Sequence, residues 1–411
     1  MRKLNDDLKI NFNRFLNNLN VSSEIGKVQE TGLNRLALTD EDKNMRDIFI
    51  EYMEKLNLQV RIDDIGNIYG RKAGNDDLPP VIIGSHLDTQ PNGGRYDGVA
   101  GVLLGLEVIE TLIEDNIETK RPVEVVNFTN EEGARFSPPM MASGVLSNEF
   151  SKEFVYSTLD KDGISFGDEL QRIGYKGLQE NRIKDIHSYV EAHIEQGPIL
   201  ANEKKDIGIV TGIQGTSWFE VELIGDSNHA GTTPMEVRKD PMFGAVEIIH
   251  ELEKLANQKS VKLTVGQLQV KPNVPNVIPK SVNFTVDIRS NENFLREEFI
   301  EIMKKISENV SEKRSVYCQF HELWESPTVK FNEEIVSTIK IKADALGYES
   351  KELVSGAGHD ARYISEIAPS AMIFMPSEGG ISHDVNEYTK DKHLNICGNL
   401  LLSVVVDLAN K

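Results

Sequence analysis

The sequence has few of the residues that mark secreted or membrane-spanning chains. It contains only two cysteines, Cys318 and Cys397, which could form one bridge, but so few in 411 residues favour free thiols in a reducing cytoplasm. No run approaches the roughly 18 uninterrupted apolar residues of a membrane-spanning helix, and the polar N-terminus lacks the apolar core of a secretion signal. We therefore expect a soluble cytoplasmic protein with no membrane partner.

Basic residues are also scarce relative to acidic ones. The chain has 45 Lys and Arg residues against 65 Asp and Glu residues, a formal net charge of -20. Such a balance repels phosphate backbones, so we do not expect a nucleic acid partner. The hydrophobic share of 39% and the charged share of 27% are those of an ordinary globular protein. A chain of 411 residues is longer than a single hydrophobic core usually accommodates, so we expect two domains.

The apolar pattern of the first half predicts an α/β layer. Val81–Gly84 and Val123–Phe128 have the composition of buried strands, and apolar residues recur at helical spacing between Val99 and Ile113. The order strand, helix, strand is typical of a largely parallel sheet. Functional groups gather beyond the carboxyl ends of strands in such sheets.

From about Gly212 the pattern changes to alternating strands and amphipathic helices. Phe219–Leu223 alternates with a period of two, and Asp240-Pro241 predicts the start of a helix. Leu263–Val270 predicts a further strand. We expect a small α+β domain inserted into an α/β domain, with catalytic parts at residues 1–211 and 327–411 and the insertion at residues 212–326.

Residue types that bind metals follow the first strand. His86 ends Gly84-Ser85-His86, and Asp88 could accept the other ring proton and fix the tautomer of a ligand. The alternative to a metal ligand is a histidine at a strand end whose ring is hydrogen-bonded within the protein. Asp97, in Gly94-Arg95-Tyr96-Asp97-Gly98, fits either the N-cap of the next helix or a carboxylate that bridges two cations.

Three later segments carry similar residues. Glu131 and Glu132 follow the second strand. Two adjacent glutamates are common on protein surfaces, but after a buried strand a cation or a shared proton must offset their repulsion. One of them could bind a metal while the other takes a proton from water. His193 and His383 are further candidate ligands, although a histidine in a strand is often simply packed.

The combination is more informative than any single segment. The nitrogen and oxygen ligands together suit zinc, manganese, cobalt or nickel, and they are His86, Asp97, Glu132, His193 and His383. Neither cysteine lies near a histidine in a loop that would favour a thiolate nucleophile. The residues therefore indicate hydrolysis by metal-activated water.

The motifs resemble one enzyme group. They are, in order, H-L-D-T, G-x-x-D-G, N-E-E-G-A-R-F, E-x-H-I-E-Q-G-P, H-A-G-T-T-P-M, P-N-V-I-P, D-I-R and G-G-x-S-H-D, between about His86 and Glu387. This set resembles the N-carbamoyl-L-amino-acid hydrolase and allantoate amidohydrolase group, in the clan of di-zinc aminoacylases and aminopeptidases.

The resemblance implies a fold and a metal centre. The fold would be a di-metal exopeptidase-like catalytic domain with an inserted lid and dimerisation domain. Two divalent metal ions, zinc or manganese, cobalt or nickel, would be bound by His86, Asp97, Glu132, His193 and His383. Asp97 would bridge the ions and Glu131 would be the general base. Aminopeptidase-like members generally have a carboxylate at the position of His193, so the histidine points to the carbamoylase side of the clan.

The resemblance also implies residues that contact the substrate. His229 would polarise the substrate carbonyl from the partner subunit of a homodimer. Arg289 would bind a substrate carboxylate through paired hydrogen bonds, although its residue type alone favours a surface salt bridge. Gln196, Asn276 and the backbone of Gly358 would make further contacts.

The implied reaction is hydrolysis of the carbamoyl C–N bond of an N-carbamoyl-L-amino acid, which releases the amino acid, CO2 and ammonia. Allantoate amidohydrolase and β-ureidopropionase activities are close alternatives. An aminoacylase or peptidase and a non-catalytic binding protein are more distant ones.

Overall fold

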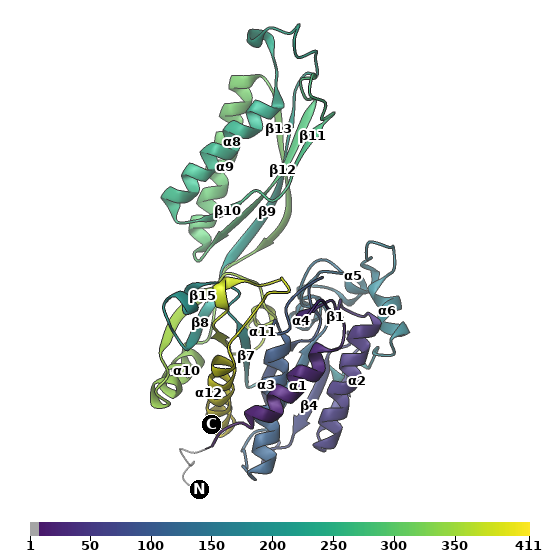
Figure 1. The fold of residues 1–411 in the computed structure, drawn as a ribbon, viewed down its shortest axis with the longest axis vertical. Coiled ribbons are helices and arrows are strands. Elements are labelled where there is room, and N and C mark those ends of the chain that lie inside the picture. Colours follow the sequence, from purple (N-terminus) through teal and green to yellow (C-terminus); the bar gives the residue numbers. More distant parts are fainter. Residues whose placement is uncertain (1–7) are drawn as a thin grey trace. The chain divides into compact units, whose positions relative to one another are not determined.

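The computed structural model describes residues 8–411, which fold into two compact units. Unit 1 combines the chain up to Gly212 with Lys330–Lys411, and unit 2 comprises Ile213–Val329. In Figure 1 the purple N-terminal and yellow C-terminal parts of the chain belong to unit 1, and the intervening teal and green part forms unit 2. Unit 2 is therefore an insertion in the sequence of unit 1.

Unit 1 is built on a nine-stranded mixed sheet (Figure 1). The strand order is β14-β8-β16-β7-β5-β6-β4-β3, and β15 pairs with β8. The strands are β3 (Gln59–Ile62), β4 (Ile68–Lys72), β5 (Val81–His86), β6 (Val123–Phe128), β7 (Ser188–Ile194), β8 (Ile207–Ile213), β14 (Val329–Lys330), β15 (Ser350–Ser355) and β16 (Ser370–Met375). A separate small hairpin pairs β1 (Lys27–Val28) with β2 (Gly32–Leu33).

The centre of this sheet is parallel and fully buried. Strands β16, β7, β5 and β6 run parallel, whereas β8 and β4 are antiparallel to the strands beside them. Every residue of β5, β6, β7 and β16 is buried, as expected for strands covered on both faces. The predicted α/β fold class is confirmed, and the carboxyl ends of these four strands meet at one edge.

Helices cover the sheet of unit 1. Helix α3 packs on β5, β6 and β7, and α12 packs on α3 and β16. The helices of this unit are α1 (Phe12–Ser23), α2 (Asp40–Lys55), α3 (Val99–Glu114), α4 (Met141–Ser147), α5 (Lys152–Ser157), α6 (Phe166–Arg172), α7 (Ile199–Asn202), α10 (Glu333–Ala345), α11 (Ala361–Ile364) and α12 (Asp391–Ala409). Short 3-10 turns occur at Gln179–Asn181 and Glu378–Gly380.

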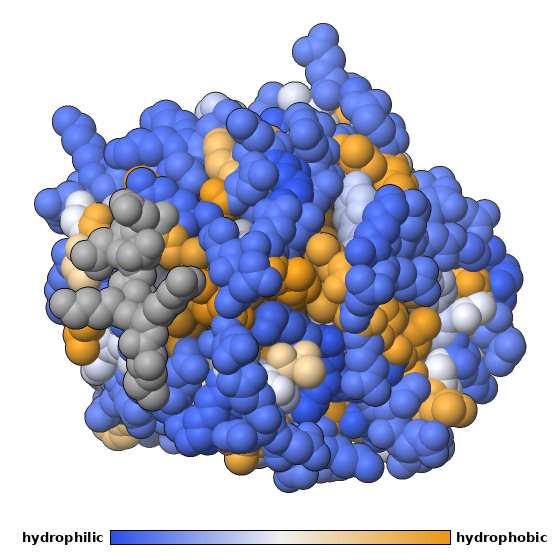
Figure 2. Space-filling model, turned by 90° about the horizontal axis from the view of Figure 1, so that it is seen from below, coloured by the Kyte–Doolittle hydropathy of each residue, from blue (hydrophilic) through white to orange (hydrophobic). Residues whose placement is uncertain are grey.

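Helix α12 has the length and apolar composition of a membrane-spanning helix, the one such helix among residues 8–411. Of its apolar window, 78% is buried inside the protein, which is the environment of a core helix. Figure 2 views the molecule from below and shows mostly hydrophilic side chains, with narrow apolar bands between them. Scattered apolar side chains of this kind are ordinary on protein surfaces.

Unit 2 is a five-stranded antiparallel sheet with two helices on one face (Figure 1). The strand order is β10-β12-β9-β13, and β11 also pairs with β12. Its elements are β9 (Gly215–Ile224), a 3-10 turn (Met235–Val237), α8 (Pro241–Lys259), β10 (Lys262–Thr264), β11 (Leu268–Lys271), β12 (Ser281–Ser290), α9 (Asn293–Arg314) and β13 (Tyr317–Ser326). Burial alternates along β12, because its inner side chains meet α8 and α9 and the outer ones do not.

Two local predictions in unit 2 can be compared with the structure. Helix α8 begins at Pro241, and the side chain of Asp240 accepts a hydrogen bond from the N–H of Met242, so the predicted N-cap is confirmed. The strand predicted at Leu263–Val270 is interrupted instead. Thr264 pairs with Asp287 and Leu268 pairs with Phe284. The chain therefore advances four residues from Thr264 to Leu268 while β12 advances only three. The extra residue forms a bulge, which the alternating pattern does not reveal.

The close packing of α3 on β7 yields a test with a matched control. A Cβ atom at Gly101 would lie 2.1 Å from the carbonyl oxygen of Ala192, whereas at Gly105 the nearest atom is the side-chain Cγ2 of Val125 at 3.1 Å. We expect Gly101→Ala to lower the free energy of unfolding by about 1–3 kcal/mol through overpacking. Gly105→Ala should change it by no more than about 1 kcal/mol, because alanine favours the helix. Urea denaturation measures both, and equal midpoints would contradict this packing.

Candidate active site

The parallel strands bring the predicted ligands to one edge of the sheet. His86 is the last residue of β5, His193 lies near the end of β7, and Glu131 and Glu132 follow the end of β6. Asp97 lies in the loop before α3, and His383 follows the 3-10 turn after β16. All six residues belong to unit 1, although they come from five separate segments.

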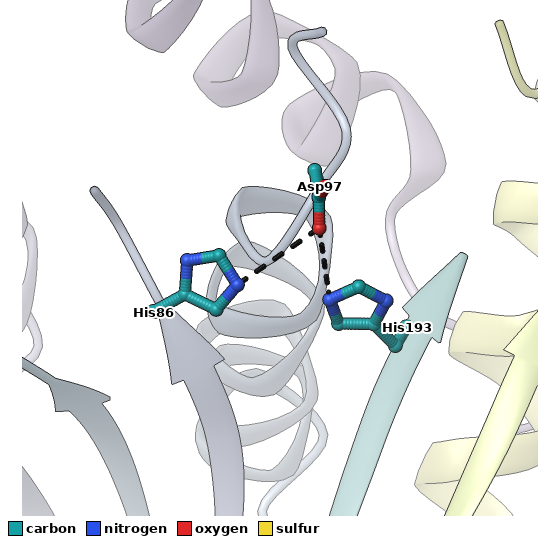
Figure 3. A group of neighbouring side chains, drawn as sticks. All are labelled: His86, Asp97 and His193. Atoms are coloured by element: carbon teal, nitrogen blue, oxygen red, sulfur yellow. Dashed lines mark ion pairs between the residues drawn. The ribbon is translucent and has the colours of Figure 1, made fainter. Parts of the chain in front are cut away.

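Asp97 lies between two histidines, as Figure 3 shows. Its Oδ1 is 3.1 Å from Nε2 of His193 and 3.9 Å from Nε2 of His86. All three side chains are buried. Gly98 allows this approach, because its φ is +65° and a Cβ there would lie 2.3 Å from the His86 ring. These three residues form a first candidate metal group.

The other oxygen of Asp97 faces a second group. Oδ2 lies 3.3 Å from Nε2 of His383, and that nitrogen lies 3.5 Å from Oε2 of Glu132. Asp97, Glu132 and His383 form this second candidate metal group. His383 is the exposed member, with 49% of its side chain accessible. Asp97 is common to both groups, so its two oxygens face different sets of ligands.

Backbone carbonyl groups fix the tautomers of the two buried histidines. Nδ1 of His86 lies 2.8 Å from the carbonyl oxygen of Asp88, and Nδ1 of His193 lies 2.9 Å from that of Ile194. A carbonyl can only accept, so each Nδ1 carries a proton, and Nε2 is the ring nitrogen that faces Asp97 and could bind a metal ion. This is the arrangement of a metal-binding imidazole.

The charges of the first group favour a cation. Burial lowers the pKa of His86 to about 4, so its ring is neutral. Burial also acts on His193, but its hydrogen bond with Asp97 outweighs it and raises the pKa to about 9. For Asp97, contacts with His193 and His383 outweigh burial and lower the carboxyl pKa well below its usual range. The space between these groups therefore favours a positive charge, which a proton or a metal ion can supply.

Asp88 differs from the prediction in how it acts. Its carboxylate was expected to accept the ring proton of His86, but its backbone carbonyl accepts that proton. The carboxylate instead accepts the N–H groups of Glu131 and Glu132, each at 3.3 Å. The prediction named the right residue and the wrong atoms, because residue spacing does not determine where a side chain turns. Asp88 thus connects the loop of His86 to the two glutamates.

The two glutamates share a buried acidic environment. Burial, followed by the charge of Asp360, raises the pKa of Glu131 well above its usual value. Burial and the charge of Asp97 raise that of Glu132. Oε2 of Glu131 lies 3.5 Å from Nε2 of His86. Oε1 of Glu132 is buried without a hydrogen-bond partner. An unpartnered buried carboxylate oxygen beside His383 and Asp97 suits a metal ligand.

Sequence reasoning did not identify Gln90, whose side-chain amide lies against Glu132. Its Nε2 donates to Oε2 of Glu132 at 2.9 Å and lies 3.3 Å from the carbonyl oxygen of the same residue. Gln90 directly follows the H-L-D-T motif, so its place in that loop was the available signal. The predicted substrate contact Gln196 also lies here, and its Nε2 donates to Oδ2 of Asp97 at 2.9 Å.

Gly358 lies in the turn before α11. A Cβ there would lie 2.9 Å from Cε of Met140, whose own N–H donates to the carbonyl oxygen of Glu131. The following residues are buried: His359 contacts Ser355 at 3.1 Å, and Asp360 accepts a hydrogen bond from Ser143. The Gly358 turn is therefore packed against the segment that follows the two glutamates.

Unit 2 carries the other predicted substrate residues, at two separate places. His229 pairs with Val277, and the N–H of Ala230 donates to the carbonyl oxygen of Asn276, so His229 and Asn276 lie side by side. Both lie beyond the end of the β9–β12 pair at which Ile224 faces Ser281. Arg289 lies near the other end of β12, opposite Thr216. The eight steps from Ser281 to Arg289 correspond to about 26 Å in an extended strand.

Arg289 has a charged neighbour on its own strand. Its Nη2 lies 2.9 Å from Oδ2 of Asp287, and the pair is partly exposed. Arg289 therefore forms a salt bridge, which was the alternative to a substrate contact in the sequence analysis.

Ser165 has the sequence context of a serine nucleophile but the structure gives it another role. Gly163-Ile164-Ser165-Phe166-Gly167 has the spacing of a nucleophile elbow. Ser165, however, is the N-cap of α6: its Oγ accepts the N–H of Asp168 and donates to the carboxylate of the same residue at 2.7 Å. The Ser165 hydroxyl therefore caps a helix and is hydrogen-bonded to a carboxylate on that helix.

Comparison with known proteins gives the family. Residues 82–407 match the profile of Peptidase family M20/M25/M40, and the chain belongs to this family. The N-carbamoyl-L-amino-acid amidohydrolase of Rhizobium meliloti is 40% identical over 407 residues, 98% of each chain. The allantoate amidohydrolase of Bacillus subtilis is 35% identical, over 94% of this chain and 95% of its own length.

A solved structure agrees with these relatives. A hydantoinase/carbamoylase family amidase from Burkholderia multivorans superposes with a TM-score of 0.93 at 39% identity, over 98% of this chain and 99% of its own. The predicted resemblance is confirmed, and the chain is an amidohydrolase-type enzyme of this family.

The shared position of Asp97 yields a test of the metal groups. If each group binds one ion, we expect Asp97→Ala to lose both, because each group then loses a ligand. His383→Ala should lose only the ion of its own group. Elemental analysis of dialysed protein by mass spectrometry measures the metal content per chain. Asp384→Ala, next to His383 but outside both groups, is the control and should match the wild type. Full metal content in Asp97→Ala would refute the grouping.

Proposed function

We propose that this enzyme is a metal-dependent N-carbamoyl-L-amino-acid amidohydrolase with a two-metal centre. The observation that carries the proposal is the position of Asp97 between two groups of imidazole and carboxylate side chains. The substrate would be an N-carbamoyl-L-amino acid, cleaved at the carbamoyl C–N bond to give the amino acid, CO2 and ammonia. The reactant other than the substrate is water.

The donor set fits two divalent ions. His86 and His193 would bind one ion, Glu132 and His383 the other, and Asp97 both. Mixed imidazole and carboxylate ligands suit zinc, manganese, cobalt or nickel. When bound, such ions supply an acidified water, with a pKa lowered from about 16 toward 7.

Glu131 is the proposed general base. It lies beside His86 but belongs to neither metal group, so its carboxylate remains available for proton transfer. Its pKa is raised by burial and by neighbouring carboxylates, which strengthens its hold on a proton. Glu131 would take a proton from the attacking water and deliver it to the leaving nitrogen.

The residues of unit 2 support a homodimer. His229 would polarise the substrate carbonyl, while Asn276 and Arg289 would bind the substrate carboxylate. Asn276 lies beyond the Ser281 end of the β9–β12 pair and Arg289 near its other end, and Ser281 and Arg289 are roughly 26 Å apart along an extended strand. One small substrate cannot span that length, so His229 and Asn276 would come from one subunit and Arg289 from the other. Unit 2 would then serve as lid and dimerisation domain.

Allantoate amidohydrolase is the second candidate, because the relative of that name matches most of this chain at 35% identity. β-Ureidopropionase activity would use the same groups on a longer ureido acid. Each of these substrates pairs a ureido group with a carboxylate, which is what the proposed metal centre and Arg289 would bind together.

A substrate panel tests this assignment. We expect ammonia release from N-carbamoyl-L-amino acids with a higher kcat/KM than from allantoate or 3-ureidopropionate, and none from the D-enantiomers. N-acetyl amino acids and dipeptides in the same panel test for aminoacylase and peptidase activity. Preference for allantoate would transfer the assignment to the second candidate. If metal-loaded protein hydrolyses none of these compounds, the result would favour the alternative of a non-catalytic binding protein.

The base is tested by Glu131→Gln. Glutamine keeps the size of the side chain but cannot accept a proton from water, so we expect kcat to fall by about 10²- to 10⁴-fold with the metal content unchanged. Glu195→Gln is the control, because Glu195 is also buried but accepts the N–H groups of Ile199 and Leu200 at the start of α7. An active, metal-loaded Glu131→Gln enzyme would refute the assignment of the base.

A further inference from the structure

Glu387 connects the loop that carries Asp97 to the loop that carries His383. It follows His383 by four residues, and its side chain is almost completely buried, with the residue 3% exposed. Oε1 accepts the backbone N–H groups of Tyr96 and Asp97, each at 3.2 Å. Oε2 accepts the hydroxyl of Ser382 at 3.0 Å. One carboxylate therefore binds donors from both loops.

Glu387 belongs to neither candidate metal group. Its two oxygens already accept three hydrogen bonds, and one of them comes from the backbone of Asp97 itself. The side chain of Glu387 thus acts on the peptide group that carries the shared ligand. Glu387 therefore acts on the metal site indirectly. It holds the loops that carry Asp97 and His383 and is not itself one of the candidate ligands.

The neighbouring sequence leaves room for this carboxylate. A Cβ at Gly94 would lie 2.0 Å from Oε1 of Glu387 and 2.4 Å from its Cβ. No side chain fits there unless Glu387 moves away from the N–H groups of Tyr96 and Asp97. Gly94 is the first glycine of the G-x-x-D-G motif, so the motif carries a space for Glu387 as well as the ligand Asp97.

The loop of His383 needs such an attachment. His383 is the exposed ligand, and its backbone has a φ of +55°, an uncommon conformation for a residue with a side chain. The hydroxyl of Thr31 donates to the carbonyl oxygen of Val385 at the exposed side of this loop. On the buried side, Ser382 lies 3.0 Å from Glu387 and 3.4 Å from Oδ2 of Asp97. Glu387 therefore limits how far His383 can move from Asp97.

We propose that Glu387 is a positioning residue that sets the spacing between Asp97 and His383 and so the affinity of the site for its metal ions. This inference rests on the two-metal centre proposed above. A ligand set that is already in place binds an ion without first ordering a loop, and loss of such outer partners typically costs about 10- to 100-fold in metal affinity. The effect should be greatest for the ion of the Asp97, Glu132 and His383 group.

The substitution series separates hydrogen bonding from bulk. We expect Glu387→Ala to weaken zinc binding by about 10- to 100-fold. Glu387→Gln keeps an oxygen that accepts the two N–H groups, so it should recover most of that loss. Gly94→Ala should resemble Glu387→Ala, because the new Cβ occupies the place of Oε1. Ser382→Ala should give a smaller loss, since it removes only one of the three hydrogen bonds.

Asp160→Ala is the matched control. Oδ1 of Asp160 also accepts two backbone N–H groups, those of Asp162 and Ile164, each at 2.9 Å. Its loop carries none of the candidate ligands. Its Oδ2 also pairs with Arg135, three residues after Glu132, so Asp160 too connects two loops. A general loss of loop order would therefore appear in Asp160→Ala as well, whereas loss of the spacing between Asp97 and His383 would not.

The measurement is zinc affinity by competition with a chromophoric chelator, on the full chain, together with the visible spectrum of the cobalt-loaded protein. We expect the cobalt spectrum to change in Glu387→Ala and Gly94→Ala but not in Glu387→Gln or Asp160→Ala. At saturating zinc, kcat of Glu387→Ala should recover and KM should stay unchanged. If Glu387→Ala does not fold, Gly94→Ala and Ser382→Ala provide the same comparison.

Wild-type zinc affinity in a folded Glu387→Ala or Gly94→Ala protein would overturn the inference. A Glu387→Gln protein as weak as Glu387→Ala would overturn it too, because the acceptor oxygen would then not be what matters. Wild-type protein that binds no zinc, manganese or cobalt would overturn the proposed metal centre itself, and this inference with it.

Discussion

The rest of the site depends on one constraint, the burial of several titratable groups around the carboxylate of Asp97. Hydrogen bonds at Nδ1 turn the Nε2 atoms of His86 and His193 toward one of its oxygens, and His383 faces the other. Glu132 adds a further carboxylate without a partner for one oxygen. In a region shielded from water such groups repel one another unless a positive charge lies between them. The proposed two-metal centre would remove this repulsion and would account for the burial of so many acidic groups together.

The backbone, more than neighbouring side chains, orients these groups. Carbonyl oxygens of Asp88 and Ile194 fix the two histidines, and the carboxylates of Asp88 and Glu387 accept the backbone N–H groups of Glu131 and Asp97. The peptide groups at the carboxyl ends of parallel strands are themselves fixed by the sheet. Rigid strands can therefore place ligands from distant segments more accurately than flexible loops could.

Unit 2 adds a constraint of length. A regular ten-residue pairing separates Arg289 from the loops of His229 and Asn276 within one chain. An extended strand cannot bend enough to bring its two ends to one small molecule. If all three residues serve one substrate, the proposed active site needs a second copy of the chain, and dimerisation becomes part of catalysis.

Much of the fold could be predicted from the sequence because it follows from local patterns. The strand Val123–Phe128 was predicted with the bounds that it has in the structure, and the N-cap at Asp240 was found from two residues. The bulge between β10 and β11 was missed, since it depends on pairing with β12 and not on the pattern of Leu263–Val270 itself. Patterns along one strand do not contain its register against another.

The sequence by itself determined the residue types of the candidate site, their order along the chain and, through shared motifs, the family. Only the tertiary structure decided which atoms meet: that Asp97 faces two groups, that Asp88 acts on the His86 ring through its carbonyl, and that Gln90 and Glu387 contact the ligand segments. The reason is physical. Ligand types and turn residues are local properties, whereas hydrogen-bond partners depend on the packing of segments that are distant in the sequence, such as Glu387 and Tyr96, which lie 291 residues apart.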